Sequence, residues 1–96
     1  MKHCILAKFR SDVDAAEKKA LLPELESLFA PLLDIEGIHK VEVIPNVVDR
    51  SNRYDILIRI DMDRDALETY DASEPHHDWK EEYGAYLEKK AIFDYD

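Results

Sequence analysis

Hydrophobic and polar residues alternate along three segments of the chain, and this alternation predicts three β-strands. The segments are residues 3–10, 38–44 and 54–62. A period of two places successive side chains on opposite faces of a sheet. One face of the first and third strands then carries His3, Ile5, Ala7, Phe9, Tyr54, Ile56, Ile58, Ile60 and Met62.

Apolar residues spaced by three and four positions predict helices elsewhere in the chain. Residues 14–33 form the longest such segment, with leucines and Phe29 recurring on one side. Pro23 and Pro31 lack an amide donor, so we expect a kink or a break in this helix. Gly37 is expected to end the helical region.

Two further helices and a last strand are predicted in the remaining third of the chain. A short helix begins at Asp63, and a second spans residues 75–90, with Pro75 suited to its first turn. Residues 91–95 then form an edge strand. The order strand, helix, strand, strand, helix, strand predicts one α+β domain over residues 1–96. Its expected fold is ferredoxin-like, an antiparallel sheet with helices on one face.

Composition and charge narrow the classes of function. No apolar run approaches the ~20 residues that a membrane-spanning helix needs, so we expect no membrane partner. The net charge of −9 repels phosphate backbones, which disfavours nucleic-acid binding. The single cysteine, Cys4, cannot form an internal disulfide and is typical of a small buried residue. Together with an N-terminus that lacks export-signal character, it predicts a cytoplasmic location.

The sheet face opposite the helices predicts a homodimer. The apolar residues expected on that face are Cys4, Leu6, Val41, Val43 and Leu57. Burying a fully exposed large side chain contributes about 1.5–3 kcal/mol, and a second copy laid sheet to sheet would cover this face. The alternative is a monomer in which Lys8, Lys40 and Arg59 keep the face solvated.

Three polar side chains fall on faces that the periodicity assigns to the core. They are His3 of the first strand, Tyr70 of the short helix and His76 of the last helix. Buried polar groups cost free energy unless they are hydrogen-bonded, so this cluster indicates a pocket or a polar network. Imidazole can act as a general base near neutral pH, and a phenol can donate to an oxyanion. The expected apolar lining is Ile5, Ala7, Leu21, Leu22, Leu25, Ile58, Trp79 and Tyr83.

Simpler interpretations of the polar residues stay open. Each side chain could bond a backbone carbonyl group and complete an ordinary core. A metal site is not expected, because the adjacent His76 and His77 point in different directions on a helix, and no organic cofactor is expected either. Asp94 and Asp96, with the loop acids, could hold a hard cation only weakly.

The chain resembles the stress-responsive A/B barrel family, often called Dabb, over nearly its whole length. No single motif is decisive, but five of them occur in the family's order. The matching segments are KHCILAKFR at 2–10, GIHKVEV at 37–43, YDIL at 54–57, LETY at 67–70 with PHH at 75–77, and IFDY at 92–95. The resemblance implies a ferredoxin-like fold and a dimer whose two sheets form a barrel.

The resemblance also suggests roles for the inward polar residues. Members of the olivetolic acid cyclase type catalyse an aldol condensation without metal or organic cofactor, using a histidine base and a tyrosine. Counting back from the FDY segment at 93–95 places that histidine at His76 and the tyrosine at Tyr70, and a first-strand active-site histidine at His3.

Departures from the family pattern make the same substrate unexpected. Family members usually have a proline two residues before the histidine, which would select His77, whereas Pro75 directly precedes His76. Leu25 stands where a pocket tyrosine is usual.

Two candidate functions remain. One is a homodimer that binds a small apolar molecule without catalysis, which we favour. The other is a cofactor-independent cyclase, lyase or isomerase.

Overall fold

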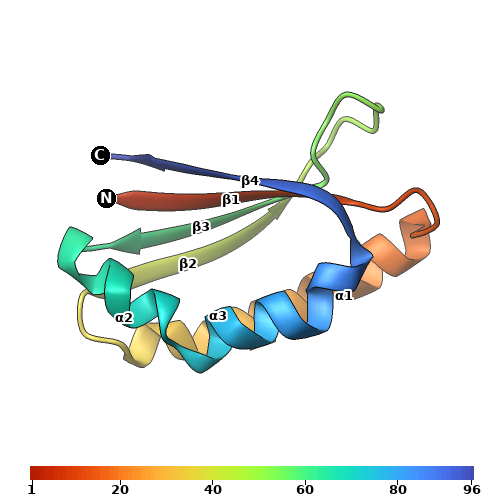
Figure 1. The fold of residues 1–96 in the computed structure, drawn as a ribbon. Helices are drawn as coiled ribbons and strands as arrows, with labels where there is room; N and C mark the ends of the chain where they lie inside the picture. Colours follow the sequence, from red (N-terminus) through yellow and green to blue (C-terminus); the bar gives the residue numbers. More distant parts are fainter.

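A four-stranded antiparallel sheet with helices on one face forms the structure, a computed structural model that describes all residues from 1 to 96. Figure 1 shows the sheet on one side and the helices on the other. The strand order is β2-β3-β1-β4, so β1 pairs with both β3 and β4. This is the predicted α+β, ferredoxin-like arrangement. The strand bounds are β1 Lys2–Phe9, β2 Ile38–Pro45, β3 Ile56–Met62 and β4 Leu87–Tyr95.

Two of the helices, α1 and α3, begin at side-chain caps. Before α1, the carboxylate of Asp14 accepts a hydrogen bond from the backbone N–H of Glu17 at 2.9 Å. Before α3, the hydroxyl of Ser73 accepts one from the N–H of His76 at 3.3 Å. Such caps satisfy donors that a helix end leaves free. The helical bounds are α1 Ala15–Phe29, η1 Ala30–Asp34, η2 Arg64–Ala66, α2 Leu67–Asp71, α3 Glu74–Asp78, the π-helical turn η3 Trp79–Tyr83 and η4 Gly84–Tyr86.

The two prolines of the long helical segment behave differently. α1 runs through Pro23, which lies inside the helix and is exposed. Pro31 lies at the start of η1, where the α-helix gives way to a tighter 3₁₀ segment. The predicted break is therefore found at Pro31. Neither α1 nor any other helix has the length and apolar character that crossing a membrane requires.

A left-handed backbone conformation at Gly37 connects η1 to β2. The φ angle is +90°, and a Cβ added there would lie 3.1 Å from Cβ of Ala66. We expect Gly37→Ala to lower the free energy of unfolding by about 1–3 kcal/mol, as measured by chemical denaturation. Gly84→Ala is the control, because a Cβ at Gly84 meets nothing within 4 Å. Equal effects of the two substitutions would contradict this account of Gly37.

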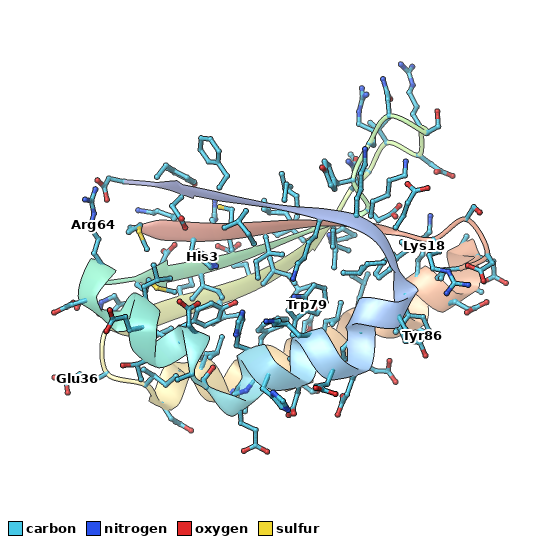
Figure 2. All side chains as sticks on the ribbon, viewed as in Figure 1. His3, Lys18, Glu36, Arg64, Trp79 and Tyr86 are labelled. Carbon is cyan, nitrogen blue, oxygen red and sulfur yellow. The ribbon has the colours of Figure 1, made fainter.

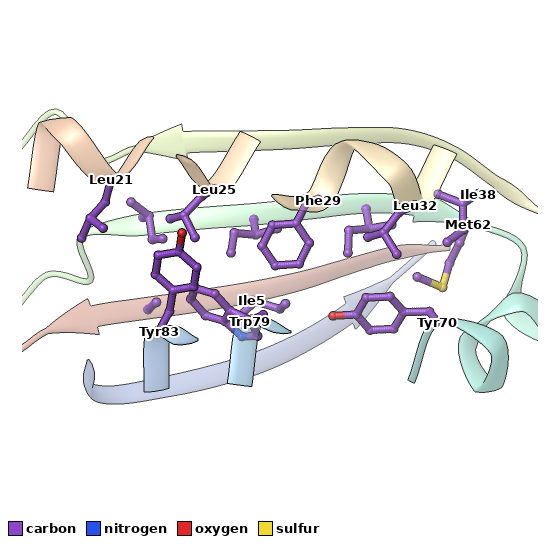
Figure 3. Packing of buried hydrophobic residues seen from close by; sticks show 14 of the residues in the cluster. Ile5, Leu21, Leu25, Phe29, Leu32, Ile38, Met62, Tyr70, Trp79 and Tyr83 are labelled. Atoms are coloured by element: carbon purple, nitrogen blue, oxygen red, sulfur yellow. The ribbon is translucent and has the colours of Figure 1, made fainter. Parts of the chain in front are cut away.

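Seventeen buried residues form a hydrophobic core between the sheet and the helices (Figure 3). On the sheet side they come from β1 and β3, with Ile38 from β2, and on the other side they come mainly from α1, α2 and η3. The largest fully buried side chains are Trp79, Tyr70, Phe29, Ile5, Leu25, Leu32, Ile58, Ile60 and Met62.

The sheet face away from the helices, here called the open face, differs in one strand from the prediction. Val41 and Val43 pair with inward-facing isoleucines of β3 and pack against the core, so their predicted place on the open face is wrong. The register shifts between Ile38 and Lys40, and an extra residue there moves every following side chain to the other face. The open face consists of Lys2, Cys4, Leu6, Lys8, Lys40, Glu42, Ile44, Leu57, Arg59, Asp61, Lys89, Ala91, Phe93 and Tyr95.

The last helical region ends earlier than the sequence predicts. The helix expected over residues 75–90 is wrong in its final part, because helical structure ends at Tyr86 and β4 begins at Leu87. Leu87 pairs with Phe9 of β1, and the pairing continues to the end of β4. This long-range ladder overrides the local helix preference of residues 87–90.

Candidate functional site

Tyr70 lies at the centre of a cluster that contains the three inward polar residues predicted from the sequence. Its side chain on α2 is fully buried. The ring centroid of His3, from β1, lies 5.1 Å away in an edge-on arrangement, and that of His76, from α3, lies 4.9 Å away. Figure 2 shows His3 between the sheet and the helices. The fold thus brings together residues that are far apart in the sequence.

The hydroxyl of Tyr70 has no hydrogen-bond partner within the chain. It points into the hydrophobic core (Figure 3). Burial raises the pKa of Tyr70 well above its ordinary value, and the negative charges of Asp71 and Asp94 raise it further. The phenol is therefore neutral throughout the physiological range and is available as a hydrogen-bond donor.

His76 is held in one orientation by the backbone of α2. Its Nδ1 lies 2.9 Å from the carbonyl oxygen of Asp71. A carbonyl oxygen only accepts, so Nδ1 carries the proton and the neutral ring keeps its lone pair on Nε2. The hydroxyl of Ser73 donates to the carbonyl oxygen of Tyr70 at 2.6 Å, which connects α2 to the start of α3. His76 can therefore act as a base through Nε2.

His3 has a carboxylate partner that the sequence reasoning did not assign to the site. Its Nδ1 lies 2.5 Å from Oδ1 of Asp94, because β1 and β4 are antiparallel and the two residues are directly paired. An ionised carboxylate accepts, so Nδ1 donates, and in the neutral form of the ring Nε2 carries the lone pair. A prediction of the pairing register between the first and last strands could have found Asp94.

The structure distinguishes the two adjacent histidines of α3. His76 contacts Tyr70, whereas His77 is exposed and its Nε2 lies 4.0 Å from a carboxylate oxygen of Glu81. The helical phase therefore places His76, and not His77, beside the buried tyrosine.

The side chains expected to line a pocket are part of the hydrophobic core. The surface clefts described below do not include His3, Tyr70 or His76. Leu22 is the exception among the expected lining residues, because it is only half-buried and lines a cleft of 290 Å³ beside α1 and the β2–β3 loop. The residues inside the core are Ile5, Ala7, Leu21, Leu25, Ile58, Trp79 and Tyr83.

No group of three or more His, Cys, Asp or Glu side chains is placed to hold a metal ion. Asp94 contacts His3, and Asp96 pairs with Arg64 and lies 3.9 Å from the N-terminal amine. Among the residues of the polar site, Tyr70 can donate a hydrogen bond, and the neutral imidazoles of His3 and His76 can accept one.

Solved structures from other organisms share this fold. A dimeric protein of unknown function with a ferredoxin-like fold from Bacteroides fragilis is 25% identical, with a TM-score of 0.80 over 99% of this chain and 93% of that one. A Dabb family protein from Mesorhizobium loti is 16% identical, with a TM-score of 0.74 over 99% and 93%. Hydroxynitrile lyase from Passiflora edulis is 12% identical, with a TM-score of 0.70 over 98% and 89%.

A search of curated proteins finds no match for the chain. A family model, however, does match its sequence. The family model described as "Stress responsive A/B Barrel Domain" matches residues 1–96, the whole described chain. This match agrees with the β1, β2 and β4 motifs and with the ferredoxin-like arrangement of the elements. The chain belongs to the Dabb family.

Proposed function

We propose that the protein is a homodimer that binds a small, largely apolar molecule between its sheet and helices, with an acceptor oxygen of that molecule at the hydroxyl of Tyr70. The observation that carries this proposal is the buried hydroxyl without a partner. A buried donor left unsatisfied costs about 1–3 kcal/mol, and buried polar groups are normally paired. A ligand oxygen would remove this cost. We further propose a cytoplasmic location, in keeping with the free thiol of Cys4.

The surroundings of Tyr70 define the chemical class of the ligand. Aliphatic and aromatic side chains of the core surround the phenol, which suits an apolar body. The phenol donates, so the ligand supplies an acceptor such as a carbonyl oxygen. The imidazoles of His3 and His76 add polar groups next to the ring. Small ketones fit this description.

The open face supports the homodimer part of the proposal. Phe93 is 63% exposed there and Tyr95 is 43% exposed, an unusual surface position for two aromatic rings. Two atoms on the same face, Nε of Arg59 and Oδ1 of Asp61, are buried without a partner. The relative from Bacteroides fragilis is described as dimeric. A second copy on this face would cover the rings and supply polar partners.

Two of the three charged residues that could keep the open face solvated, Lys8 and Arg59, are bonded within the chain, whereas Lys40 is exposed. The ammonium of Lys8 donates to the backbone of the β2–β3 loop, at the carbonyl oxygens of Ser51 and Arg53. The guanidinium of Arg59 donates to Glu42 at 2.6 Å. That loop projects beyond the sheet on the side away from the helices (Figure 1), and a second copy on the open face would lie beside it.

Ligand binding is tested with a panel of small ketones and isothermal titration calorimetry. We expect Tyr70→Phe to weaken the binding of a ketone by about five- to tenfold, the value of one lost hydrogen bond. Tyr86→Phe is the matched control, because Tyr86 is 41% exposed and lies outside the cluster. Unchanged affinity in Tyr70→Phe would contradict the proposed ligand position.

Proton abstraction is a second candidate function, and the orientation of His76 favours it. Its Nε2 lone pair lies on a ring that contacts Tyr70. In this reaction Nε2 removes a proton from the carbon next to a ketone carbonyl, the C–H electron pair moves toward the carbonyl, and Tyr70 donates to the resulting enolate oxygen. The products are an imidazolium ring and a hydrogen-bonded enolate.

Deuterium exchange of a ketone α-proton, followed by NMR in D₂O, tests this candidate. We expect His76→Gln to slow the exchange by about 10²–10⁴-fold, while His77→Gln leaves it unchanged. Exchange that is equally fast in His76→Gln and wild type would remove the catalytic role. Ketone affinity, measured separately, would still decide the binding proposal.

A further inference from the structure

An exposed groove between α1 and α3 is lined by four carboxylates and by no lysine or arginine. Its volume is 450 Å³. One acid, Glu24, comes from α1, and the others come from α3 and its π-helical continuation. This groove lies apart from the cluster around Tyr70 and contains none of its three polar residues. The lining is Glu24, Ser27, Leu28, Pro31, Glu74, Pro75, Asp78, Glu82 and Tyr83.

The acids of this groove form a row rather than a cluster. Glu74 and Asp78 are four residues apart on one helix, about 6 Å along its axis, and Glu82 continues the row. No three acidic, histidine or cysteine side chains converge closely enough to hold a metal ion. An elongated cation with separated charges therefore matches this pattern better than a point ion.

Tyr83 gives the groove a second feature that does not depend on its charge. The residue is 8% exposed and lines the groove, and none of the hydrogen bonds of the chain involves its hydroxyl. Figure 3 shows this hydroxyl directed toward α1. Burial raises the pKa of Tyr83, and the charges of Glu24 and Glu82 raise it further, so the phenol stays neutral. Its oxygen can accept a hydrogen bond from an ammonium group.

We propose that this groove binds a linear oligoamine, a chain of ammonium groups separated by short alkyl spacers. The ammonium groups lie along the acidic row, and one of them donates to the hydroxyl of Tyr83. The alkyl spacers contact the apolar lining at Leu28, Pro31 and Pro75. The net charge of −9 adds a long-range attraction for such a cation.

Spermidine is the probe, and the emission of Trp79 reports on the site. Trp79 is the only tryptophan, and its ring stacks on Tyr83 with the centroids 6.0 Å apart. At low ionic strength, where exposed ion pairs are least screened, we expect a saturable change in emission with one spermidine per protomer. Magnesium ion at the same ionic strength should give no saturable change. Absence of saturation with spermidine would overturn the proposal.

Charge-matched variants separate this groove from general attraction to an acidic protein. We expect the double variant Glu24→Gln/Asp78→Asn to bind spermidine about fivefold more weakly, because it loses two exposed ion pairs with the ligand. The control, Glu26→Gln/Glu68→Gln, removes two exposed carboxylates outside the groove and should change affinity less than about twofold. Equal weakening in both would overturn the proposal. Displacement of spermidine by a tighter-binding lysine-rich peptide would also overturn it, in favour of a protein partner.

Discussion

Replacing Tyr70 by phenylalanine is expected to raise the free energy of unfolding by about 1–3 kcal/mol while ligand binding falls. The wild-type hydroxyl is buried without a partner, and phenylalanine fills the same space without the unsatisfied group. For a domain of this size, each kcal/mol raises the melting temperature by about 4–8 °C. Thermal denaturation at equal protein concentrations measures the effect. Opposite changes in stability and binding are typical of a functional group kept at a cost in stability.

The same substitution should change how stability depends on pH. The pKa of Tyr70 is raised in the folded protein, so the unfolded chain loses its tyrosine proton first as the pH rises. The difference between the folded and unfolded pKa values adds to the free energy of unfolding. This addition is complete below about pH 10, the ordinary pKa of tyrosine, and it declines above that pH. Tyr70→Phe should show a smaller alkaline loss of stability than wild type.

A matched control makes the stability result specific. Tyr86→Phe removes an exposed hydroxyl and should leave both the melting temperature and its alkaline decline close to those of wild type. A Tyr70→Phe variant that is less stable than wild type would show that the hydroxyl has a structural partner. That outcome would remove the main support for the proposed ligand position.

Replacing Phe93 by lysine is expected to shift the protein from dimer to monomer. The ring lies on the open face and is 63% exposed in the protomer, and in the proposed dimer two-fold symmetry would place two such rings in one interface. Loss of an aromatic anchor commonly costs about 2 kcal/mol or more, so two copies weaken the dimer by about a thousandfold. Sedimentation velocity over a range of concentrations measures the dissociation constant.

The control for the dimer prediction is Leu33→Lys. Leu33 is 50% exposed in η1, and it lies in the helical layer rather than on the open face. This variant should remain as dimeric as wild type, because it adds the same charge at a site outside the proposed interface. A Phe93→Lys protein that is still fully dimeric would place the interface elsewhere, and a wild-type protein that is monomeric would remove it.

The parts of the fold that follow from local patterns could be predicted from the sequence. Alternation found β1 and β3, and helical spacing found α1 and placed His76 on the side of Tyr70. These patterns depend only on neighbouring residues, so one sequence is enough to detect them. The polar cluster followed from them, since each of its members lies in phase with apolar residues of the same element.

The errors arose where distant segments decide the local structure. The bulge between Ile38 and Lys40 reverses the faces of β2, and it becomes evident only from the pairing with β3. The early end of the last helix reflects pairing of Leu87 with β1. The role of Asp94 beside His3 needs that same register. No pattern within a single element of the sequence contains this information.

The most direct test of the account is the ¹³Cζ resonance of Tyr70, recorded in tyrosine-labelled protein with and without a saturating ketone from the panel. A hydrogen bond from this hydroxyl to the ketone oxygen predicts a shift of the Tyr70 resonance that is larger than the shift of any other tyrosine. A saturated protein whose Tyr70 resonance does not move would contradict the claim that this hydroxyl receives the ligand.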